Sequence, residues 1–364
     1  MGDLGVERVC CLLHNLIPGG SGWQWVRLLG RHVEQGGEAT IFAPSGLLAE
    51  PARAAGIDVV DVSWSETGET AERPLRTALE RADAAIVHWD HEVMNRFAPA
   101  AKACGRVALV VHQAPQAMQW LGPEVVEEGR GAIEAALADP RGVVLVRGAA
   151  HRRRFVAAFD LPGAELQVLP ASIPVEAIPF APRLGEPRRV LALTRLSPEK
   201  APVIRLAVNL VRRRLALGRP CMLSLAGAGS WRAETIELCE RSLPAGCWRV
   251  EDAPERPIER LAGSDLVVAQ GVTTLEAAAL GRRVVVARKA GEEGAAGAVL
   301  TAAGYDEAGR DPFGEPPLAT DPGQLWPDAL AVDEAELREL RSLIETHNSL
   351  PAAARALGAA LATI

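Results

Sequence analysis

Several kinds of segment are missing from this 364-residue sequence. It has no stretch of about 18 apolar residues, which a membrane-spanning helix needs. Its first residues lack a basic segment followed by an apolar run, so we expect no secretory signal. The formal net charge of -7 shows no basic excess, which argues against a nucleic-acid partner. These absences favour a cytoplasmic protein and leave peripheral contact with a membrane as an open alternative.

Cysteine and lysine are both scarce. The six cysteines form no C-x-x-C pair and show no metal-ligand spacing with histidine, so we expect reduced thiols and no metal site. Of 39 basic residues only Lys102, Lys200 and Lys289 are lysine. A lysine is therefore an unusual choice in a chain that otherwise uses arginine.

Short apolar runs alternate with helix-length segments along both halves of the chain. Such runs are typical of parallel strands that are buried on both faces of a sheet, and they predict a doubly wound α/β architecture. The runs span residues 8–14, 39–43, 57–62, 84–88, 106–112 and 143–146 in the first half, and 190–196, 222–226, 248–251, 266–270 and 284–287 in the second.

The chain is longer than the roughly 250 to 300 residues at which a single core stops growing, so two domains are expected. Periodicity disappears between residues 170 and 189, where prolines accumulate and remove backbone donors. Residues 288–327 are rich in glycine and proline, and 334–344 and 350–361 follow as amphipathic helices. We predict an N-terminal domain over 1–172, a linker over 173–188, a second domain over 189–330 and C-terminal helices over 331–364.

A glycine-rich turn follows the first predicted strand. Gly19, Gly20, Ser21 and Gly22 stand directly before a helical pattern. Glycines let backbone N–H groups approach a ligand, and a helix N-terminus favours phosphate. The alternative is a tight turn without a ligand, since the spacing is neither G-x-G-x-x-G nor a Walker loop.

The second candidate is the T-R-L-S-P-E-K segment at 194–200, where a strand pattern gives way to a helix. A serine cap followed by proline suits a helix start, and Arg195 and Lys200 are the residue types that neutralise a diphosphate. A solvated lysine at a helix start is the alternative.

The third candidate is the Q-G-V-T-T-L-E segment at 270–276, again between a strand and a helix. Gly271 and the amides of Val272, Thr273 and Thr274 are suited to phosphate oxygens at a helix N-terminus. Glu276 is suited to accept hydrogen bonds from vicinal ribose hydroxyls. Its alternative role is to complement the helix dipole.

Together these segments resemble a known family. Residues 195–200, 225–229, 264–268 and 275–286 look like the successive signatures of GT4-like retaining glycosyltransferases, in order and in spacing. Residues 17–22 resemble the N-terminal glycine loop of that family. The resemblance spans most of the chain and is weakest after Arg288.

The resemblance implies a GT-B fold, with two Rossmann-like domains facing a cleft. It implies that the second domain binds a nucleotide-diphosphate sugar, with Arg195, Lys200 and Gly227 near the diphosphate and Glu276 at the ribose. The glycine loop of the first domain would face the diphosphate. His112, which ends a strand, resembles the histidine that lies near the donor sugar and acceptor, so it is the catalytic candidate.

The sequence departs from the family at one important position. Family members carry a second glutamate eight residues before the ribose-binding one, and here that position is Val268. Which residues contact the transferred sugar is therefore an open question. His88, Asp90 and His91 end another strand and are candidates to line an acceptor site. The absence of D-x-D argues against diphosphate binding through a metal, so Arg195, Lys200 and helix N-termini must meet that charge.

The sequence therefore predicts a metal-independent glycosyltransferase that moves a sugar, of the hexose type, from a nucleotide-diphosphate donor to a small-molecule or glycan acceptor. It needs no resident cofactor, because the nucleotide sugar is a co-substrate. Two alternatives stay open. An NDP-sugar epimerase would bind the same donor without an acceptor, and a GT-B scaffold would bind nucleotide without turnover.

Overall fold

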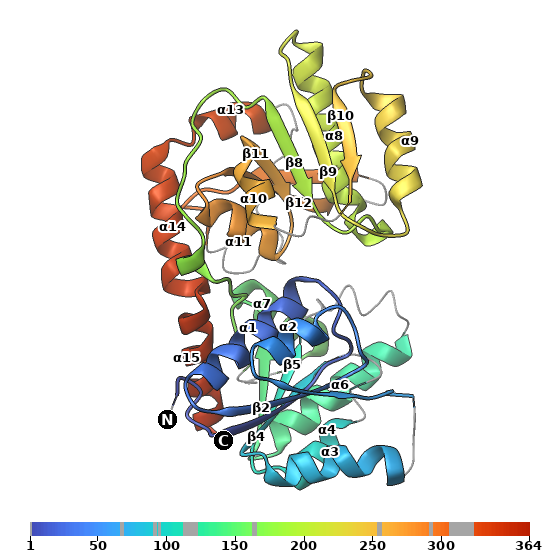
Figure 1. Cartoon of the computed structure of the whole chain (residues 1–364), viewed down its shortest axis with the longest axis vertical. Coiled ribbons are helices and arrows are strands. Elements are labelled where there is room, and N and C mark those ends of the chain that lie inside the picture. Colours follow the sequence, from blue (N-terminus) through green and yellow to red (C-terminus); the bar gives the residue numbers. More distant parts are fainter. Residues whose placement is uncertain are drawn as a thin grey trace. The chain divides into compact units, whose positions relative to one another are not determined.

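The chain was analysed as a computed structural model, which describes residues 2–65, 69–89, 93, 96–111, 123–161, 166–252, 257–290, 294–305 and 324–364. It separates into two compact units (Figure 1). Unit 1 comprises residues 1–172 and 350–364, and unit 2 comprises residues 173–349. The two C-terminal helices thus belong to different units, and the predicted linker segment belongs to unit 2.

Unit 1 is built on a parallel sheet with strand order β3-β2-β1-β4-β5-β6-β7. The chain builds outward from β1 to β3 and then crosses to β4 on the other side of β1, so the switch point lies between β1 and β4. The strands are β1 (Arg8–Leu12), β2 (Glu38–Ala43), β3 (Asp58–Asp61), β4 (Ala84–His88), β5 (Val107–Val111), β6 (Gly142–Val146) and β7 (Gln167–Val168). The helices are α1 (Gly20–Glu34), α2 (Ala49–Ala54), α3 (Glu69–Arg81), α4 (Phe97–Ala103), α6 (Pro123–Ala138), α7 (Ala149–Phe159) and α15 (Leu350–Ala362).

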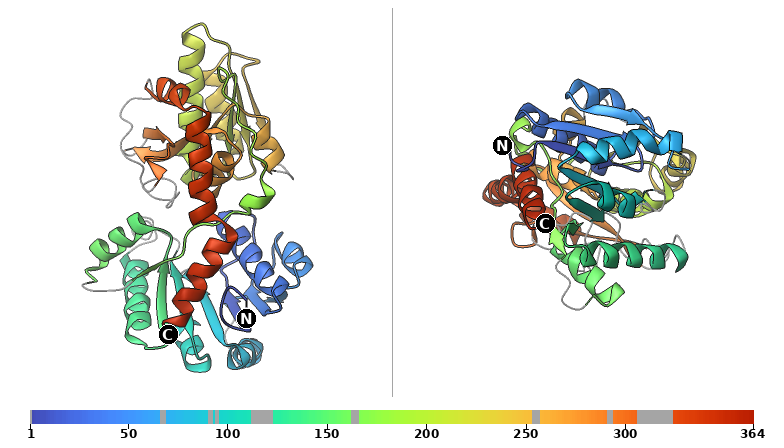
Figure 2. Two further views of the ribbon diagram at one scale, coloured as in Figure 1. Left: turned by 90° about the vertical axis from the view of Figure 1, so that its left-hand side faces the viewer. Right: turned by 90° about the horizontal axis from the view of Figure 1, so that it is seen from below.

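Helices cover both faces of this sheet (Figure 2). Alternate residues of a strand point to opposite faces, and β1 shows this directly. Cys11 packs in a core with α1, α2 and α15, whereas Cys10 and Leu12 pack in a second core with α3, α4, α6 and α7. Burial on both faces explains why the strands are continuously apolar and not alternating.

Unit 2 has a second sheet, with strand order β10-β9-β8-β11-β12-β13. All pairs are parallel except β12 with β13. Its strands are β8 (Arg189–Leu193), β9 (Met222–Ala226), β10 (Trp248–Glu251), β11 (Leu266–Ala269), β12 (Arg283–Ala290) and β13 (Gly294–Val299). Its helices are α8 (Ala201–Ala216), α9 (Arg232–Ser242), α10 (Pro257–Ala262), α11 (Val272–Ala279), α13 (Leu325–Ala331) and α14 (Glu334–Asn348), with 3-10 turns η2 (Val175–Ala177) and η3 (Pro198–Lys200).

Helix α8 supplies most of the core on one face of this sheet, and α13 extends that core through Trp326. On the other face, α11 packs against β11, β12 and α14. The start of α14 is capped by Asp333, whose carboxylate accepts a 2.9 Å hydrogen bond from the amide of Glu336. Arg341 of α14 donates to the carbonyls of Val175 and Ala279, at 2.8 and 2.7 Å, and so ties this helix to η2 and α11.

The structure confirms the predicted α/β architecture with two sheets. It adds β7, β13 and α13, which the sequence did not predict, and β13 runs antiparallel to its neighbour. Within the described part of the chain, every helix is too short or too polar to cross a bilayer.

Candidate functional site

The carboxyl edge of the unit 2 sheet carries the segments that follow β8, β9 and β11. The switch point of this sheet lies between β8 and β11, because β9 and β10 extend from one side of β8 and β11 lies on the other. In open parallel sheets, ligands bind outside the carboxyl ends of the strands at such a point. Lys200, which follows β8, donates through Nζ a 3.1 Å hydrogen bond to Oε1 of Gln270, which follows β11. One hydrogen bond therefore spans the switch point.

The segment after β8 is held in place by its backbone. The amides of Thr194 and Leu196 donate to the carbonyls of Ala226 and Ala228, at 3.0 and 2.9 Å, so this segment continues the β8–β9 pairing past the end of the strands. Pro198 begins η3, where its fixed φ suits the first turn, and Lys200 ends it and caps α8. The local backbone thus delivers Lys200 to the edge of the sheet.

Two cationic side chains belong to this segment. Arg195 is exposed and forms a 3.2 Å ion pair with Glu199. Lys200 is half-buried, and burial together with the neighbouring charge of Arg195 lowers the pKa of its ammonium, against an opposing effect of Glu199. A partly desolvated cation next to a second cation is stabilised by an anionic ligand. This pair therefore favours a bound anion at the switch point.

Gly227 has a structural reason to be glycine. A Cβ atom there would lie 1.8 Å from the carbonyl oxygen of Thr194, and one at Gly229 would lie 2.1 Å from that of Leu196. Both glycines let the loop after β9 pass closely against the segment after β8. Their packing accounts for their identity, and the predicted contact of Gly227 with a diphosphate stays a prediction.

The turn from β11 into α11 is made by two residues, Gln270 and Gly271. Gly271 has φ 75° and ψ -146°, a backbone conformation that side chains strongly disfavour, and it caps α11. The first amides of a helix lack partners within the helix and carry its positive partial charge. The amides that begin α11 thus lie next to the residue that bonds to Lys200.

The side chains along α11 differ in their surroundings. Val272 and Thr274 are buried, Thr273 is half-buried, and Glu276 is 9% exposed on the second turn of the helix. A glutamate buried to this degree is uncommon for a residue that only complements a helix dipole, since carboxylates that do so usually stay in water.

Val268 lies inside β11 and is fully buried against the α8 face of the sheet. The chain reaches Gly271 only three residues later, so no loop projects from the end of β11. The position of the usual second glutamate is thus part of the core. Among the described residues, no three or more His, Cys, Asp and Glu side chains gather into a metal-binding group.

In unit 1, the predicted glycine loop is the start of a helix. Gly19 caps α1, and Gly20, Ser21 and Gly22 form its first turn. A Cβ at Gly22 would lie 2.8 Å from the carbonyl oxygen of Ile17, whereas one at Gly19 would meet no atom within 4 Å. Gly22 is therefore required by packing, and Gly19 leaves an open approach to the helix N-terminus.

Two histidines mark the switch point of the unit 1 sheet. His14 follows β1 and His88 ends β4, which are neighbours in the sheet. Both ring nitrogens of His88 are shielded from water. Burial, with the charges of Arg147 and His14, lowers the pKa of His88 to about 3. His112, Asp90 and His91 lie outside the described residues.

The sequence did not point to the residues beside these histidines. Arg147 follows β6, is 1% exposed, and donates to the side-chain oxygen of Gln24, a fully buried residue of α1. Gln24 in turn donates a 3.1 Å hydrogen bond to the carbonyl of Pro170. An arginine directly after an apolar strand is the signal that could have identified this network, because buried arginines need organised partners.

No protein-family model and no curated protein sequence matches this chain. Solved structures do match it over almost its full length. HepE of Anabaena, in complex with UDP-glucose, has a TM-score of 0.70 at 16% identity, covering 98% of this chain and 100% of HepE. A glycosyltransferase of Rickettsia africae has a TM-score of 0.61 at 11% identity, covering 98% and 93%. WaaG, a glycosyltransferase involved in lipopolysaccharide biosynthesis, has a TM-score of 0.63 at 14% identity, covering 97% and 99%.

These likenesses establish the fold. The chain has the two-domain α/β fold of the GT-B glycosyltransferases, as the sequence predicted. Identities this low carry no residue roles or substrates from those proteins to this one.

Proposed function

We propose that the chain is a glycosyltransferase that takes a sugar from a nucleotide-diphosphate donor. The observation that carries this proposal is the Lys200–Gln270 hydrogen bond across the switch point of unit 2, beside the N-terminus of α11. A half-buried ammonium and a helix N-terminus at one strand edge are complementary to a diphosphate. The fold shared with glycosyltransferases supports the same reading.

Each candidate residue has a role in this proposal. Lys200 and Arg195 neutralise the diphosphate, with the amides from Gly271 to Thr274 at the helix start. Glu276 accepts from the ribose hydroxyls. In unit 1, the open helix start from Gly19 to Gly22 is proposed to meet the diphosphate, and His112 to lie near the reacting sugar.

The proposed reaction is balanced without a protein nucleophile. The bond between the anomeric carbon and the diphosphate oxygen breaks, and a bond from that carbon to the acceptor oxygen forms. The acceptor oxygen attacks from the same face of the sugar that the diphosphate leaves, so configuration is retained, and the proton of the acceptor hydroxyl goes to the departing diphosphate. Charge on the leaving group is met by Lys200, Arg195 and helix N-termini, so the proposal includes no metal and no resident cofactor.

Because all six cysteines are free, we also propose a cytoplasmic location.

One observation favours a second candidate function. The two-residue turn between β11 and α11 contains no carboxylate, so the usual second glutamate has no counterpart there. A chain that binds a nucleotide sugar without transferring it would have this arrangement. Turnover must therefore be measured directly and not inferred from binding.

The test has two stages. Thermal-shift measurements with UDP, GDP, ADP, CDP and dTDP and their sugars identify the nucleotide, because a bound ligand raises the melting midpoint by mass action. UDP-glucose is the first donor to test, since HepE was solved in complex with it. Product analysis with the preferred donor then separates transfer from epimerisation. We expect release of nucleotide with transfer of sugar; a changed sugar that stays on the nucleotide would make the chain an epimerase, and tight binding without release would make it a scaffold.

A further inference from the structure

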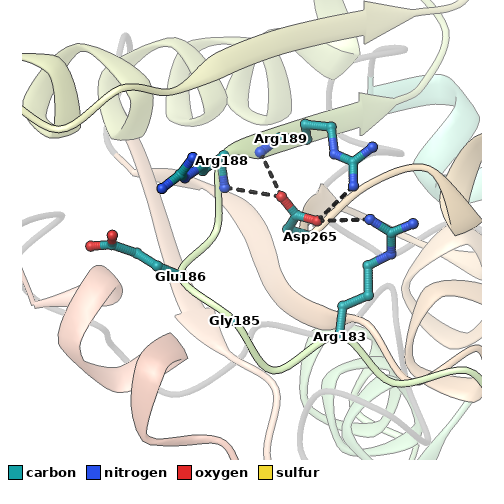
Figure 3. A pocket seen from close by; sticks show the side chains of 6 residues that line it. All are labelled: Arg183, Gly185, Glu186, Arg188, Arg189 and Asp265. Carbon is teal, nitrogen blue, oxygen red and sulfur yellow. Dashed lines mark hydrogen bonds and ion pairs between the residues drawn. The ribbon is translucent and has the colours of Figure 1, made fainter.

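A second charged site lies at the opposite edge of the unit 2 sheet (Figure 3). A pocket of about 330 Å³ is lined by Arg183, Gly185, Glu186, Arg188, Arg189 and Asp265. Arg189 is the first residue of β8, and Asp265 directly precedes β11. The pocket is therefore at the amino ends of the two strands whose carboxyl ends lead to Lys200 and Gln270. It is distinct from the candidate donor site.

The carboxylate of Asp265 is fully engaged. It accepts hydrogen bonds from the amides of Arg188 and Arg189, at 3.0 and 2.9 Å, and from the guanidinium groups of Arg183 and Arg189, at 3.2 and 3.3 Å. A carboxylate offers about four lone-pair sites, so these four bonds fill it. Asp265 can therefore accept no further hydrogen bond from the guanidinium group of Arg188.

The arginines at the pocket have N–H donors that Asp265 does not use. A guanidinium has five N–H donors in a planar fork, and Arg183 and Arg189 each use one on Asp265. The side chain of Arg188 is exposed and forms no hydrogen bond or ion pair with the described residues. In Figure 3, Arg183 and Arg189 point toward Asp265, and Arg188 points away from it, to the side of Glu186.

The second carboxylate at the pocket is also occupied. Glu186 forms ion pairs with Arg214 and Arg219. Five guanidinium groups thus surround two carboxylates, which leaves an excess of three positive charges at this edge in a chain of net charge -7. Arg283 adds to the positive field, since the hydrogen bonds of its buried guanidinium go to the carbonyls of Val332, Gly185 and Leu184 and to no carboxylate.

We propose that this pocket binds a small phosphate-bearing anion. The guanidinium fork matches two phosphate oxygens, and the excess of positive over negative charge around this hollow attracts anions. A volume of about 330 Å³ is at the lower end for small-ligand pockets and admits inorganic phosphate or pyrophosphate. The ligand would accept from the guanidinium donors of Arg183 and Arg188 that Asp265 and Glu186 do not use.

The test is a calorimetric titration with inorganic phosphate and with pyrophosphate at constant ionic strength. Because phosphate is also expected to bind the candidate donor site, all proteins carry Lys200→Ala. On that background we compare the parent, Arg188→Gln, and the double variant Arg183→Gln with Arg188→Gln. The control is Arg212→Gln, which removes the same charge from an exposed arginine of α8 that has no partner in the described structure.

We expect saturable binding to the parent and the control. Arg188→Gln should weaken it about tenfold, and the double variant about a hundredfold, because each removes a charge-assisted donor. Arg188→Gln removes no side-chain hydrogen bond or ion pair among the described residues, so it is informative even if the double variant unfolds. Non-saturable binding to the parent, or equal affinity in Arg188→Gln and Arg212→Gln, would overturn the proposal. Neither outcome depends on whether the chain transfers a sugar.

Discussion

Lys200 and Gln270 are seventy positions apart in the sequence, yet Nζ of the first lies 3.1 Å from Oε1 of the second. The amide oxygen is a neutral partner for a charged donor. A diphosphate would be a stronger partner, because it adds the attraction between opposite charges to the hydrogen bond. Gln270 is thus suited to hold Lys200 in position and to yield it to an incoming anion.

The lowered pKa of Lys200 makes a prediction about pH. Diphosphate binding requires the charged ammonium, and burial with the nearby charge of Arg195 lowers its pKa. Affinity for the preferred nucleoside diphosphate should therefore fall as pH rises through this lowered pKa, at a lower pH than an exposed lysine would require. In Lys200→Arg the guanidinium stays charged, so the alkaline fall should disappear. Calorimetry from pH 7 to 10 checks this, and parallel pH profiles in both proteins would remove Lys200 from the site.

Glu276 distinguishes ribose binding from stabilisation of a helix. If it accepts from the ribose, Glu276→Gln should weaken nucleotide binding by about 1.5 to 3 kcal/mol and hardly change the melting midpoint without ligand. If it only complements the helix dipole, the change should cost about 0.3 to 1 kcal/mol of folding stability and leave affinity unchanged.

The 2'-deoxyribose analogue provides the control for Glu276. It should bind wild type more weakly than the ribonucleotide does, and the difference should shrink in Glu276→Gln. Equal losses in both proteins would show that the carboxylate does not contact the ribose.

His88 predicts loss of stability in acid. Its pKa is about 3 in the folded chain, against about 6.5 when unfolded. Above pH 6.5 both states are neutral and stability is complete; as pH falls from 6.5 toward 3, only the unfolded chain gains the proton, so stability declines. One proton changes stability by about 1.4 kcal/mol per pH unit. Denaturant titrations of wild type and His88→Gln from pH 7 to 4 should show a smaller slope in the variant, and an unchanged slope would contradict the assignment.

Metal removal gives another prediction. Since the diphosphate charge is proposed to be met by protein groups, transfer should survive EDTA at the rate measured without it. A rate that falls to background in EDTA and returns with Mg²⁺ or Mn²⁺ would refute this.

Much of the fold could be predicted because buried parallel strands are continuously apolar. Residues 84–88 and 143–146 were predicted as strands and are found in β4 and β6. The exceptions depend on tertiary contacts. Gly294–Val299 contains only glycine and alanine apart from one valine, and glycine and alanine are depleted in strands; it is a strand because it pairs antiparallel with β12. Leu325–Ala331 contains a proline and is helical because Trp326 packs against α8.

The site was partly predictable for a similar reason. Helix starts after strands identified the segments at 194–200 and 270–276, since cap residues and glycines leave a local signature. The partnership of Lys200 with Gln270 left none, because β8 and β11 are neighbours in the sheet but not in the chain. Likewise the close approach of Gly227 to Thr194 is visible only in three dimensions, and the contact of Gly227 with a diphosphate stays a prediction.

The most direct test of the central claim is the affinity of the preferred nucleoside diphosphate for Lys200→Ala and Arg195→Ala. Each variant should bind about ten- to a hundredfold more weakly than wild type, because each loses a charge-assisted contact worth about 1.5 to 3 kcal/mol. Arg212→Ala, an exposed arginine of the same unit, is the control and should bind as wild type does. Circular dichroism should show all four proteins folded. Wild-type affinity in both Lys200→Ala and Arg195→Ala would contradict a diphosphate site at the switch point of unit 2.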